Sequence, residues 1–411
     1  MQMQRKIQRA WQRKAAMAAL TVFTAASYGT GYAMPQGGEV KAGNADIKTS
    51  GNTMDVNQNT QKVAIDWKGF DIAKQETVNF NQPNAAAIAL NRVTGSKGSE
   101  IYGHLNANGQ VFLINPNGVL FGKGAEVNVG GLVATTHNIN NDDFMNSKGS
   151  YTFTGDSANQ VKNEGTIKAE GGLVALLASD VANEGTIRTN KGTTALGAGQ
   201  SMTIDYENDG KINFAVNKSI ANAKALNSGS IQANGGYVVM TARDASTTLN
   251  TVVNNTGVIE AKSLKNVNGE IVLDGGEQGV VEVGGTLDAS GDEAGQTGGT
   301  IKVVGANTVV KSGTLLKATG DQAGGFIETS GTVLNVAQNV NVDTSSANGK
   351  NGEWLLDPTN ITIVDDGDIV VARGRRGQVR EGLSVEEHLS AGGFIDAADY
   401  FHQRGFPGTV F

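Results

Sequence analysis

The chain has 411 residues, with 56 Gly, 5 Pro, no Cys and a formal net charge of −7, so Gly is about twice as common as its average of about 7%. Scarce Pro and the lack of a three-residue Gly period exclude collagen, and the lack of Cys excludes disulfides and thiolate metal sites. Apolar runs are too frequent for a wholly disordered chain, and none reaches the ~18–20 residues of a membrane-spanning helix.

The first 33 residues have the three-part pattern of a secretory signal peptide. Five basic residues and no acidic ones precede an apolar run at residues 15–26, and small residues stand at Gly31 and Ala33. This order predicts export by the general secretion machinery and cleavage after Ala33. The alternative is an amphipathic surface helix, which the gathering of all charge at one end disfavours.

Removing this segment leaves a strongly acidic chain. It takes 5 of the 33 basic residues with it, so 28 remain against 40 acidic ones, a net charge of −12. Such a chain, with scattered Lys, offers no footprint for nucleic acid or anionic lipid, and we expect no nucleic-acid partner. The lack of Cys also suits a chain that stays unfolded in an oxidising periplasm.

Residues 40–370 alternate short apolar bursts with Gly, Asn, Asp, Ser and Thr. Representative bursts lie at 111–114, 173–177, 237–240 and 301–304. Bursts this short, rich in Val and Ile and bounded by turn formers, indicate β-strands. Helical periodicity is missing, except that Pro83 followed by the Ala-rich residues 84–90 predicts one short helix.

A seven-residue pattern recurs along the chain. It reads NEGTIKA at 163–169 and NEGTIRT at 183–189, with looser copies at 227–233, 255–261, 284–289 and 312–318. The shared Gly residues are 20, 44, 28, 28 and 28 positions apart, and we interpret the step of 44 as two turns of 22. A period of 20–28 residues is typical of a solenoid. Leucine-rich repeats are excluded, because their Leu and Asn spacing is missing.

These repeats predict an all-β chain folded as a parallel β-solenoid. Short strands bury their apolar faces only when coils stack at the ~4.7–4.9 Å strand spacing. Small residues fit the corners, and Asn side chains can bond from coil to coil. Roughly 330 residues at ~22 per coil predict about 15 coils and a rod about 70 Å long. A β-sandwich or propeller array is the alternative, disfavoured by the scarcity of aromatic residues.

The last 41 residues, 371–411, differ from this texture. They hold no Asn and no Lys, but five Arg and two of the four His residues. Three interpretations stay open: a capping or linker segment, a designed end, or sequence read in another frame, of which we favour the last. We expect this tail to pack poorly on the solenoid or to form a loose helix, and the chain to be a truncated form of a longer exoprotein.

The sharpest local motif is Asn115-Pro116-Asn117-Gly118, between two apolar bursts. Pro at the second position presets φ, and the first Asn can cap a backbone N–H, so the motif predicts a type I β-turn. Taken alone, it indicates a tight turn at the surface.

The surrounding blocks carry a family resemblance. Residues 78–84, 89–93, 101–122, 125–136 and 352–363 resemble the secretion domain of two-partner secretion exoproteins, the filamentous haemagglutinin N-terminal family, in its high-molecular-weight-adhesin branch. The likeness spans about residues 34–369. It departs at Gln82-Pro83-Asn84, where the haemagglutinin branch has an Asn-Pro-Asn element, and family members usually run to thousands of residues.

The resemblance implies a fold and an export route. The fold is a right-handed parallel β-helix with an N-terminal cap and extra-helical hairpins. The exoprotein enters the periplasm by the general secretion route, is bound by the POTRA domains of a dedicated outer-membrane barrel, crosses unfolded and folds outside. The resemblance places the secretion motif at Asn115, Pro116, Asn117 and Gly118, with a secondary motif at Gln82, Pro83 and Asn84. Such recognition can use an extended segment that adds a strand to a sheet edge.

Four regions are therefore expected. They are the signal peptide at 1–33, the secretion domain at 34–270, continuing β-helix repeats at 271–370, and the atypical tail at 371–411.

Enzyme chemistry has little support in the sequence. The His-Glu-x-x-His, Gly-x-Ser-x-Gly and Walker motifs are missing. Polysaccharide lyases and hydrolases with this fold need clustered charged side chains, whereas Arg92, Arg188 and Arg243 are isolated in the sequence. We therefore expect no enzyme activity and no cofactor.

Metal ligands are equally sparse. Asp365-Asp366-Gly367-Asp368 has the residue types of a calcium site, but the Gly-rich calcium repeat is missing, so a charged turn is favoured. His104 and His137 are expected to decorate strands or loops. No metal is expected.

Three functional hypotheses remain open. The leading one is a secreted or surface-exposed adhesin- or haemagglutinin-like exoprotein, whose host-cell or bacterial receptor is unidentified. The second is the N-terminal part of a contact-dependent inhibition toxin or a haemolysin, which shares this N-terminus. The third is a β-helix enzyme acting on polysaccharide, for which a groove with Tyr, Trp and paired acids is missing from the sequence.

Overall fold

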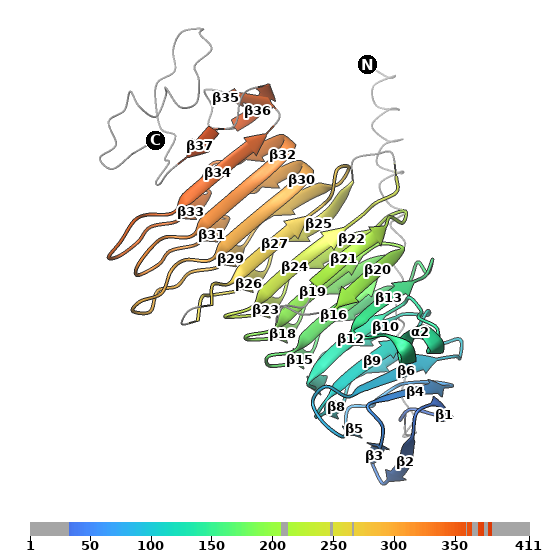
Figure 1. Cartoon of the computed structure of the whole chain (residues 1–411). Helices are drawn as coiled ribbons and strands as arrows, with labels where there is room; N and C mark the ends of the chain where they lie inside the picture. The colour runs from blue at the N-terminus through green and yellow to red at the C-terminus, as the bar shows by residue number, and fades with distance from the viewer. Residues whose placement is uncertain are drawn as a thin grey trace, which may run out of the picture. The chain divides into compact units, whose positions relative to one another are not determined.

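The computed structural model describes residues 33–206, 213–246, 250–264, 267–358, 360–363, 369–373 and 377–379. Residues 33–411 form one compact unit, and its described part is a parallel β-helix (Figure 1), which confirms the predicted fold class. The predicted signal peptide before Ala33, the turn at Asp365–Asp368 and most of the tail lie outside the described residues.

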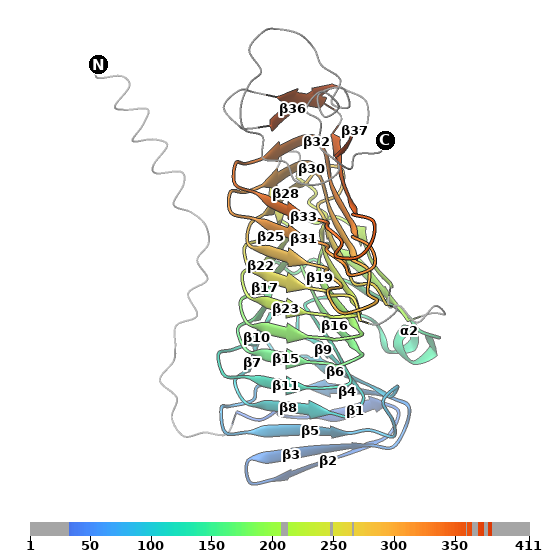
Figure 2. The ribbon, with the colours of Figure 1, turned by 90° about the vertical axis from the view of Figure 1, so that its left-hand side faces the viewer.

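One face of the β-helix is a sheet of short parallel strands. Figure 2 turns this face toward the viewer, with one strand from each coil. Its strands, in sheet order, are β3 (Thr53–Gln58), β5 (Thr77–Asn81), β8 (His104–Ala107), β11 (Glu126–Asn128), β15 (Thr166–Lys168), β18 (Thr186–Arg188), β23 (Ser230–Gln232), β26 (Val258–Glu260), β29 (Thr286–Asp288), β31 (Leu315–Lys317) and β33 (Asn341–Asp343).

The other two faces belong to one large sheet, because the two longest strands run across both. The first series of parallel strands is β7 (Ser99–Ile101), β10 (Val119–Phe121), β14 (Gln160–Asn163), β17 (Asp180–Asn183), β22 (Lys224–Asn227), β25 (Thr251–Asn255) and β28 (Val280–Val283). The second is β4 (Lys62–Trp67), β6 (Ile88–Val93), β9 (Gln110–Ile114), β12 (Gly131–Thr135), β16 (Leu173–Ala178), β19 (Thr193–Ala198), β24 (Tyr237–Ala242), β27 (Glu270–Asp274) and β34 (Glu353–Pro358). The bridging strands are β30 (Thr300–Val310) and β32 (Phe326–Val336).

The ends of the described β-helix carry antiparallel strands. At the start, β1 (Glu39–Ala42) pairs with β4 and β2 (Ala45–Ser50) pairs with β3. Toward the C-terminus, β35 (Asn360–Ile363), β36 (Ile369–Arg373) and β37 (Gly377–Val379) pair antiparallel on the large sheet. We expected residues 371–411 to pack poorly on the solenoid or to form a loose helix. The described tail residues, 371–373 and 377–379, instead belong to strands of the large sheet, because open N–H and C=O groups at a sheet edge accept a further strand.

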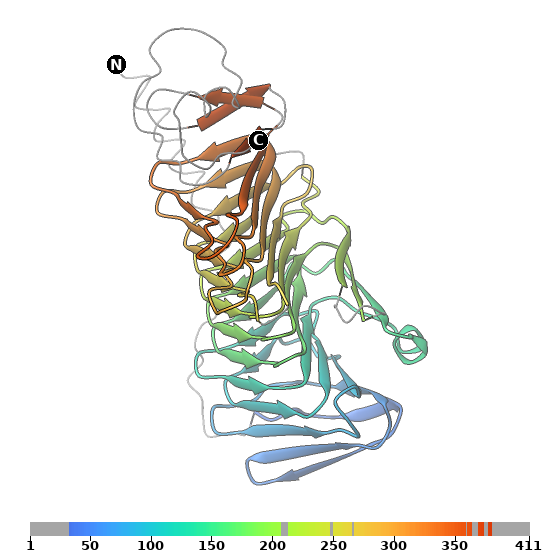
Figure 3. The ribbon, with the colours of Figure 1, turned by 60° about the vertical axis from the view of Figure 1, so that its left-hand side comes forward.

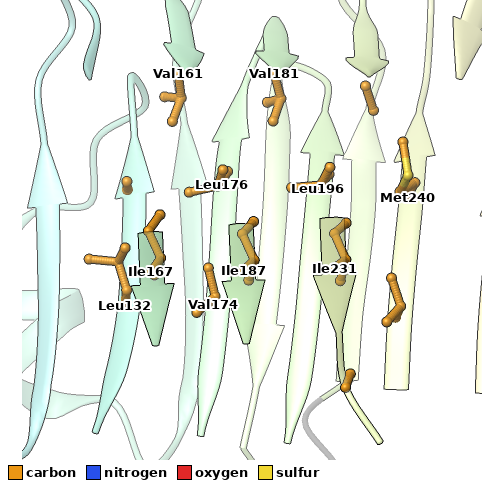
Figure 4. Close-up of a cluster of buried hydrophobic side chains, with 14 of the residues drawn as sticks. Leu132, Val161, Ile167, Val174, Leu176, Val181, Ile187, Leu196, Ile231 and Met240 are labelled. Atoms are coloured by element: carbon orange, nitrogen blue, oxygen red, sulfur yellow. The ribbon is translucent and has the colours of Figure 1, made fainter. Parts of the chain in front are cut away.

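The recurring pattern places one large apolar side chain inside each coil. In the NEGTIKA copies the middle strand residue points inward, so Ile167, Ile187, Ile231 and Ile259 are fully buried. Figure 4 shows Ile167, Ile187 and Ile231 between inward Val and Leu residues of the large sheet. In these coils the narrow interior is filled mainly by aliphatic side chains, and the aromatic residues of the interior, such as Trp67, Phe80 and Trp354, lie in the early and late coils.

Asn side chains bond from coil to coil, as the sequence predicted. Asn163 Nδ2 donates to Asn183 Oδ1 over 2.8 Å, and the chain continues from Asn183 to Asn227 and from Asn227 to Asn255, each over 2.7 Å. All four residues are buried. The ladder satisfies these amides inside the rod, where an unpaired amide is costly.

The predicted coil count is wrong. The short-strand sheet holds eleven parallel strands among the described residues, so its ten steps give about 50 Å rather than about 70 Å. The step of 44 residues is one coil and not two, because β18 pairs directly with β23. The additional residues leave the coil after β19 and form a hairpin outside it.

The predicted helix at residues 84–90 is also wrong. Residues 84–87 form a tight turn, in which Asn84 Oδ1 accepts from the backbone N–H of Ala86 and Asn84 O accepts from that of Ala87. Strand β6 then begins at Ile88, and Ala89 and Leu90 are fully buried in it. Burial on both faces of β6 in a packed coil outweighs the helical propensity of Ala. The described residues contain one helix elsewhere, α2 (Asn141–Asn146), which Asn140 caps by accepting from Asp143 N.

Two excursions leave the coils and meet outside, as Figure 3 shows. The first contains α2 and β13 (Ser150–Thr154), and the second contains β20 (Ser201–Asp205) and β21 (Asn213–Lys218). Strands β13, β20 and β21 form an antiparallel sheet, here called the extra-helical sheet. It covers part of the outer face of the large sheet. Phe112 of β9 contacts Phe144 of α2 and Tyr151 and Phe153 of β13.

Candidate transporter-recognition site

The motif at Asn115–Gly118 forms the turn between β9 and β10. Gly118 N donates to Asn115 O over 3.0 Å, which closes the turn, and Asn115 Oδ1 accepts from Asn117 N over 2.9 Å. Gly118 has φ +104°, a conformation that favours Gly. The predicted cap and turn are thus present.

The expectation that this turn lies at the surface is wrong for Asn115, which is 0% exposed. Its Nδ2 donates to Lys97 O and to Ser99 Oγ, both over 3.0 Å. Its backbone N–H donates to Thr135 O over 2.9 Å. The side chain therefore fills the corner of the preceding coil, because a polar Asn can be buried only where both ends of its amide find partners.

The turn is also tied to the following coil. Pro116 O accepts from Ser157 Oγ over 2.6 Å and from Asn159 Nδ2 over 2.9 Å, and Ser179 Oγ donates to Ser157 O over 2.8 Å. On the other side, Asn117 Nδ2 donates to Gly95 O over 2.9 Å. The turn thus links three successive corners of the β-helix.

The secondary motif has the same character. Gln82 is buried and its Nε2 donates to Gln58 Oε1, Ala87 O and Gln110 O over 3.0, 3.1 and 3.2 Å. Its Oε1 accepts from Gly109 N over 2.9 Å. Pro83 and Asn84 are exposed. Among the described residues no hydrogen bond joins this motif to the Asn115 turn, so the two are separate corners.

Asn108 completes the Gln82 corner and was missed by the sequence analysis. Asn108 Oδ1 accepts from Gln82 N over 2.7 Å and its Nδ2 donates to Gln82 O over 2.8 Å. The available signal was Asn108-Gly109, a turn-forming pair before an apolar burst.

Arg92, expected to be isolated, holds the first excursion on the β-helix. Its guanidinium donates to Asp66 Oδ1 over 3.1 Å, to Asn138 Oδ1 and Asn141 Oδ1 over 2.9 Å, and to Ile139 O over 2.5 Å. These partners position the segment that leads into α2. Arg243, likewise expected to be isolated, pairs with Asp274 over 2.5 Å.

Lys62 holds the other end of α2. Its Nζ donates to Phe144 O over 2.8 Å and to Ser147 O over 2.7 Å, and it lies 5.1 Å from the centre of the Tyr151 ring. A cation suits the C-terminal carbonyls of a helix, and burial lowers the pKa of Lys62.

The two described His residues differ in setting. His104 is half-buried and lies 3.5 Å from the carboxylate of Glu126. His137 is fully buried where the first excursion leaves β12, with Nδ1 3.1 Å from Thr136 Oγ1. Its Nε2 has no hydrogen-bond partner among the described residues, and burial lowers its pKa.

Residues that could hold a metal do not gather in the part of the chain that the structure describes, where no three His, Asp or Glu side chains are placed to bind one ion. No helix in that part has the length and apolar character to cross a membrane.

A parallel β-helix with a capped start, an extra-helical sheet and a buried Asn-Pro-Asn-Gly corner defines a secretion module. The family model of the TPS secretion domain matches residues 32–292. The chain belongs to this two-partner secretion family, which indicates a protein exported across the outer membrane with the help of a transporter.

Similar proteins come from Haemophilus influenzae. A heme/hemopexin-binding protein of strain Rd is 33% identical over 261 residues, which cover 62% of this chain and 28% of that protein. A second heme/hemopexin-binding protein is 37% identical over 278 residues, covering 62% and 29%. The crystal structure of the HMW1 secretion domain matches with a TM-score of 0.67 and 32% identity, covering 76% of this chain and 84% of that one. The chain spans under a third of the length of the curated relatives it matches.

Proposed function

We propose that this chain is the secretion module and first repeats of an adhesin-like exoprotein, delivered through a dedicated outer-membrane barrel whose periplasmic POTRA domains bind it. The match of the secretion-domain family to residues 32–292 carries the proposal. The predicted signal peptide, with cleavage after Ala33, takes the chain to the periplasm in this scheme. The described solenoid crosses residue 270 without a break, because β27 pairs with both β24 and β30, and this continuity supports repeats that continue from the module.

The burial of the motif supports recognition before folding. Asn115 and Gln82 are buried in the folded corners, so a transporter has access to their amides only while the chain is extended. The same amides that a transporter binds then become internal bonds of the solenoid outside the cell. Folding outside the cell thereby buries the recognition element, so the folded chain no longer binds the transporter and export proceeds outward only.

The export step is tested by expressing the full chain with and without its cognate barrel. Release into the culture medium should require the barrel, with chain retained in the periplasm in its absence. Equal release in both strains would refute export by a partner transporter.

Recognition by the motif is tested with a matched pair of variants. Asn115→Ala and Asn183→Ala each remove a fully buried Asn that bonds neighbouring coils, but only Asn115 lies in the motif. Secretion of Asn115→Ala should fall well below that of Asn183→Ala, although both lose similar stability. Equal secretion would leave Asn115 with a structural role alone.

The names of the relatives support a second candidate for the whole protein, the binding of heme or hemopexin. Two relatives carry the name heme/hemopexin-binding protein. Immobilised chain can be offered hemopexin and host-cell membranes in parallel. Preferential capture of hemopexin would favour this candidate, and capture of host-cell membranes without hemopexin binding would favour the adhesin.

A further inference from the structure

Three basic residues, Lys168, Arg188 and Lys191, here called the basic triplet, gather at the end of β15 and β18, the first two on the outer face of the short-strand sheet and the third at its edge. Lys168 and Arg188 are direct neighbours in the ladder of β15 and β18, and Lys191 follows at the next corner. All three side chains are exposed. Like charges on adjacent strands repel, at a cost comparable to other cross-strand pair energies. Because the chain after residue 33 is strongly acidic, three basic residues without acidic neighbours stand out from the rest of its surface.

The protein neutralises a comparable pair elsewhere on the same face. Glu260 and Asp288 are also in-register neighbours of like charge. Lys262 lies between them, with its Nζ 3.6 Å from Glu260 and 3.2 Å from Asp288. The charge of Lys317, further along the face, is paired with Asp292 over 2.6 Å.

No carboxylate neutralises the basic triplet in the described part of the chain, as Lys262 neutralises Glu260 and Asp288. Among the described residues, none of its three members forms an ion pair. Glu164 and Glu184, at the far ends of these strands, are both bound by Lys162. Glu170 lies at the near corner and forms no ion pair within the described part either.

Lys191 also has a positive φ, a backbone conformation for which the equivalent positions of the adjacent coils use Gly. The corresponding corner residues of the coils before and after are Gly171 and Gly235, with φ of +71° and +68°, and Lys191 has φ +62°. The three corners stack through backbone bonds, from Gly171 N to Asn190 O and from Lys191 N to Asn234 O, each 2.8 Å. The other non-Gly residues described with positive φ are both Asn, which tolerates this region better. Lys191 is therefore strained, and strain of this kind is characteristic of functional positions.

We propose that the basic triplet binds an acidic polysaccharide laid along the solenoid axis, across β15, β18 and β23. Carboxylate or sulfate groups would supply the missing counter-charges. Thr166, Thr186 and Ser230 form a row of outward hydroxyl groups on the same three strands, suited to bonding sugar hydroxyls. A sugar ring in a linear chain is close in length to the spacing of these strands, so successive rings meet successive coils.

The character of this face disfavours other occupants. Exposed large hydrophobic residues in the described part are limited to Val258 and Val267, so an apolar peptide or lipid tail gains little burial here. Single-stranded nucleic acid needs aromatic stacking platforms, and the short strands of this face carry no aromatic residue outside the buried Phe80.

The binding test uses secreted full chain and defined probes at low ionic strength. The probes are polygalacturonate and dextran sulfate, with neutral dextran, duplex DNA and inorganic sulfate for comparison. The acidic polysaccharides should bind, and binding should weaken as salt screens the charges. Equal binding of neutral dextran, or of DNA, would overturn the assignment to acidic polysaccharide, and binding of inorganic sulfate alone would do the same.

Lys191→Gly separates binding from folding. It should raise the thermal unfolding midpoint, because Gly adopts this φ without strain, yet weaken polysaccharide binding about two- to fivefold, the effect of losing one exposed charge contact. Adding Lys168→Gln and Arg188→Gln should weaken it more than tenfold. Lys224→Gln, which removes an exposed charge from another face, should have no effect. A triple variant that binds like the wild type, or an equal loss in Lys224→Gln, would disprove the site. The test concerns the folded chain and is independent of how it is exported.

Discussion

At the scale of single residues, buried amides hold this molecule together at its corners. Asn115 Nδ2 and Oδ1 serve Lys97, Ser99 and Asn117 at once. Gln82 serves three carbonyl or amide oxygens in the same way. Each such side chain satisfies backbone groups that the turn itself leaves unpaired, and an unpaired buried group costs about 1–3 kcal/mol.

Asn115→Ala should therefore lower the free energy of unfolding by about 2–3 kcal/mol, since it strands buried partners on both sides of the turn. Asn117→Ala, which removes a half-buried side chain bonded chiefly to Gly95 O, should cost about 1 kcal/mol. Urea unfolding of both variants measures the difference. A cost for Asn115→Ala no greater than that for Asn117→Ala would contradict the role of burial.

Sequence reasoning predicted the turn at this corner but not its burial. The turn follows from Asn, Pro, Asn and Gly at four consecutive positions, which is local information. The burial depends on Lys97 and Ser99, from the preceding corner, and on Ser157 and Asn159 from the following one. Those partners come together only when the coils stack, and no local sequence pattern predicts them.

His137 should make stability depend on pH in the weakly acidic range. Burial holds the pKa of His137 below its ordinary value of 6.5, so the folded state takes up a proton less readily than the unfolded state. Its contribution is fully present above about pH 6.5 and is lost as the pH falls toward the folded pKa. The slope is at most about 1.4 kcal/mol per pH unit.

The measurement compares wild type with His137→Gln between pH 7 and pH 5. Wild-type stability should decrease more steeply over this interval, because carboxylates that titrate at lower pH are common to both proteins. Parallel curves for the two proteins would argue against a neutral buried His137.

At the scale of elements, the extra-helical sheet rests on a surface that glycine makes possible. A Cβ on Gly197 would lie 2.2 Å from the Phe214 ring, and one on Gly199 would lie 2.3 Å from Val216. Both glycines lie at the end of β19, and both partners lie on β21. The close approach of β19 and β21 therefore requires Gly at both positions.

Gly197→Val should loosen β21 from the β-helix and cost about 1–3 kcal/mol, the usual price of overpacking. Amide hydrogen exchange should quicken in β20 and β21 and stay unchanged in the coils. Gly69→Ala is the control, because a Cβ there meets no atom within 4 Å. Unchanged exchange in β21 of Gly197→Val would show that the sheet does not depend on this contact.

Lys62→Met should release the C-terminal end of α2. The variant keeps the apolar stem of Lys62 but removes the ammonium that donates to Phe144 O and Ser147 O, and we expect a loss of about 1–3 kcal/mol. Proteolysis of the native protein should then begin at residues 138–149. Resistance equal to that of the wild type would contradict the anchoring role.

Strands were predictable from the sequence where they repeat, and excursions were not. The apolar bursts became strands because stacked coils bury them. Strands β9, β16 and β24 are buried on both faces along most of their length, whereas β30 alternates buried and half-buried residues. The step of 44 was misread because spacing alone does not distinguish two coils from one coil with a hairpin. The Ala-rich segment at 84–90 was misread because its helical propensity yields to the coil that it joins.

At the scale of the whole molecule, the β-helix behaves as a stack in which each coil contacts only its neighbours. Stability in such a stack is approximately a sum of coil and interface terms. The Asn ladder from Asn163 to Asn255 runs through four successive coils and crosses the three interfaces between them. The aromatic cluster and the extra-helical sheet cover the coils of β9 and β12 and the first two coils of the ladder itself, those of β16 and β19. The described coils after the ladder lack that cover.

Asn183→Ala should split the unfolding of the rod into two steps. It interrupts the ladder, leaves Asn163 Nδ2 and Asn227 Oδ1 without their partners, and weakens the interface by about 2–4 kcal/mol. Trp67 and Trp354 are buried in early and late coils, so Trp354→Phe and Trp67→Phe backgrounds report each end by fluorescence. In the intact ladder the two probes should lose their signal at one urea concentration. In Asn183→Ala the Trp354 signal should be lost first, because the late coils have no extra-helical sheet to hold them. Coincident transitions in the variant would mean that cooperativity passes through the aliphatic interior and not through the ladder.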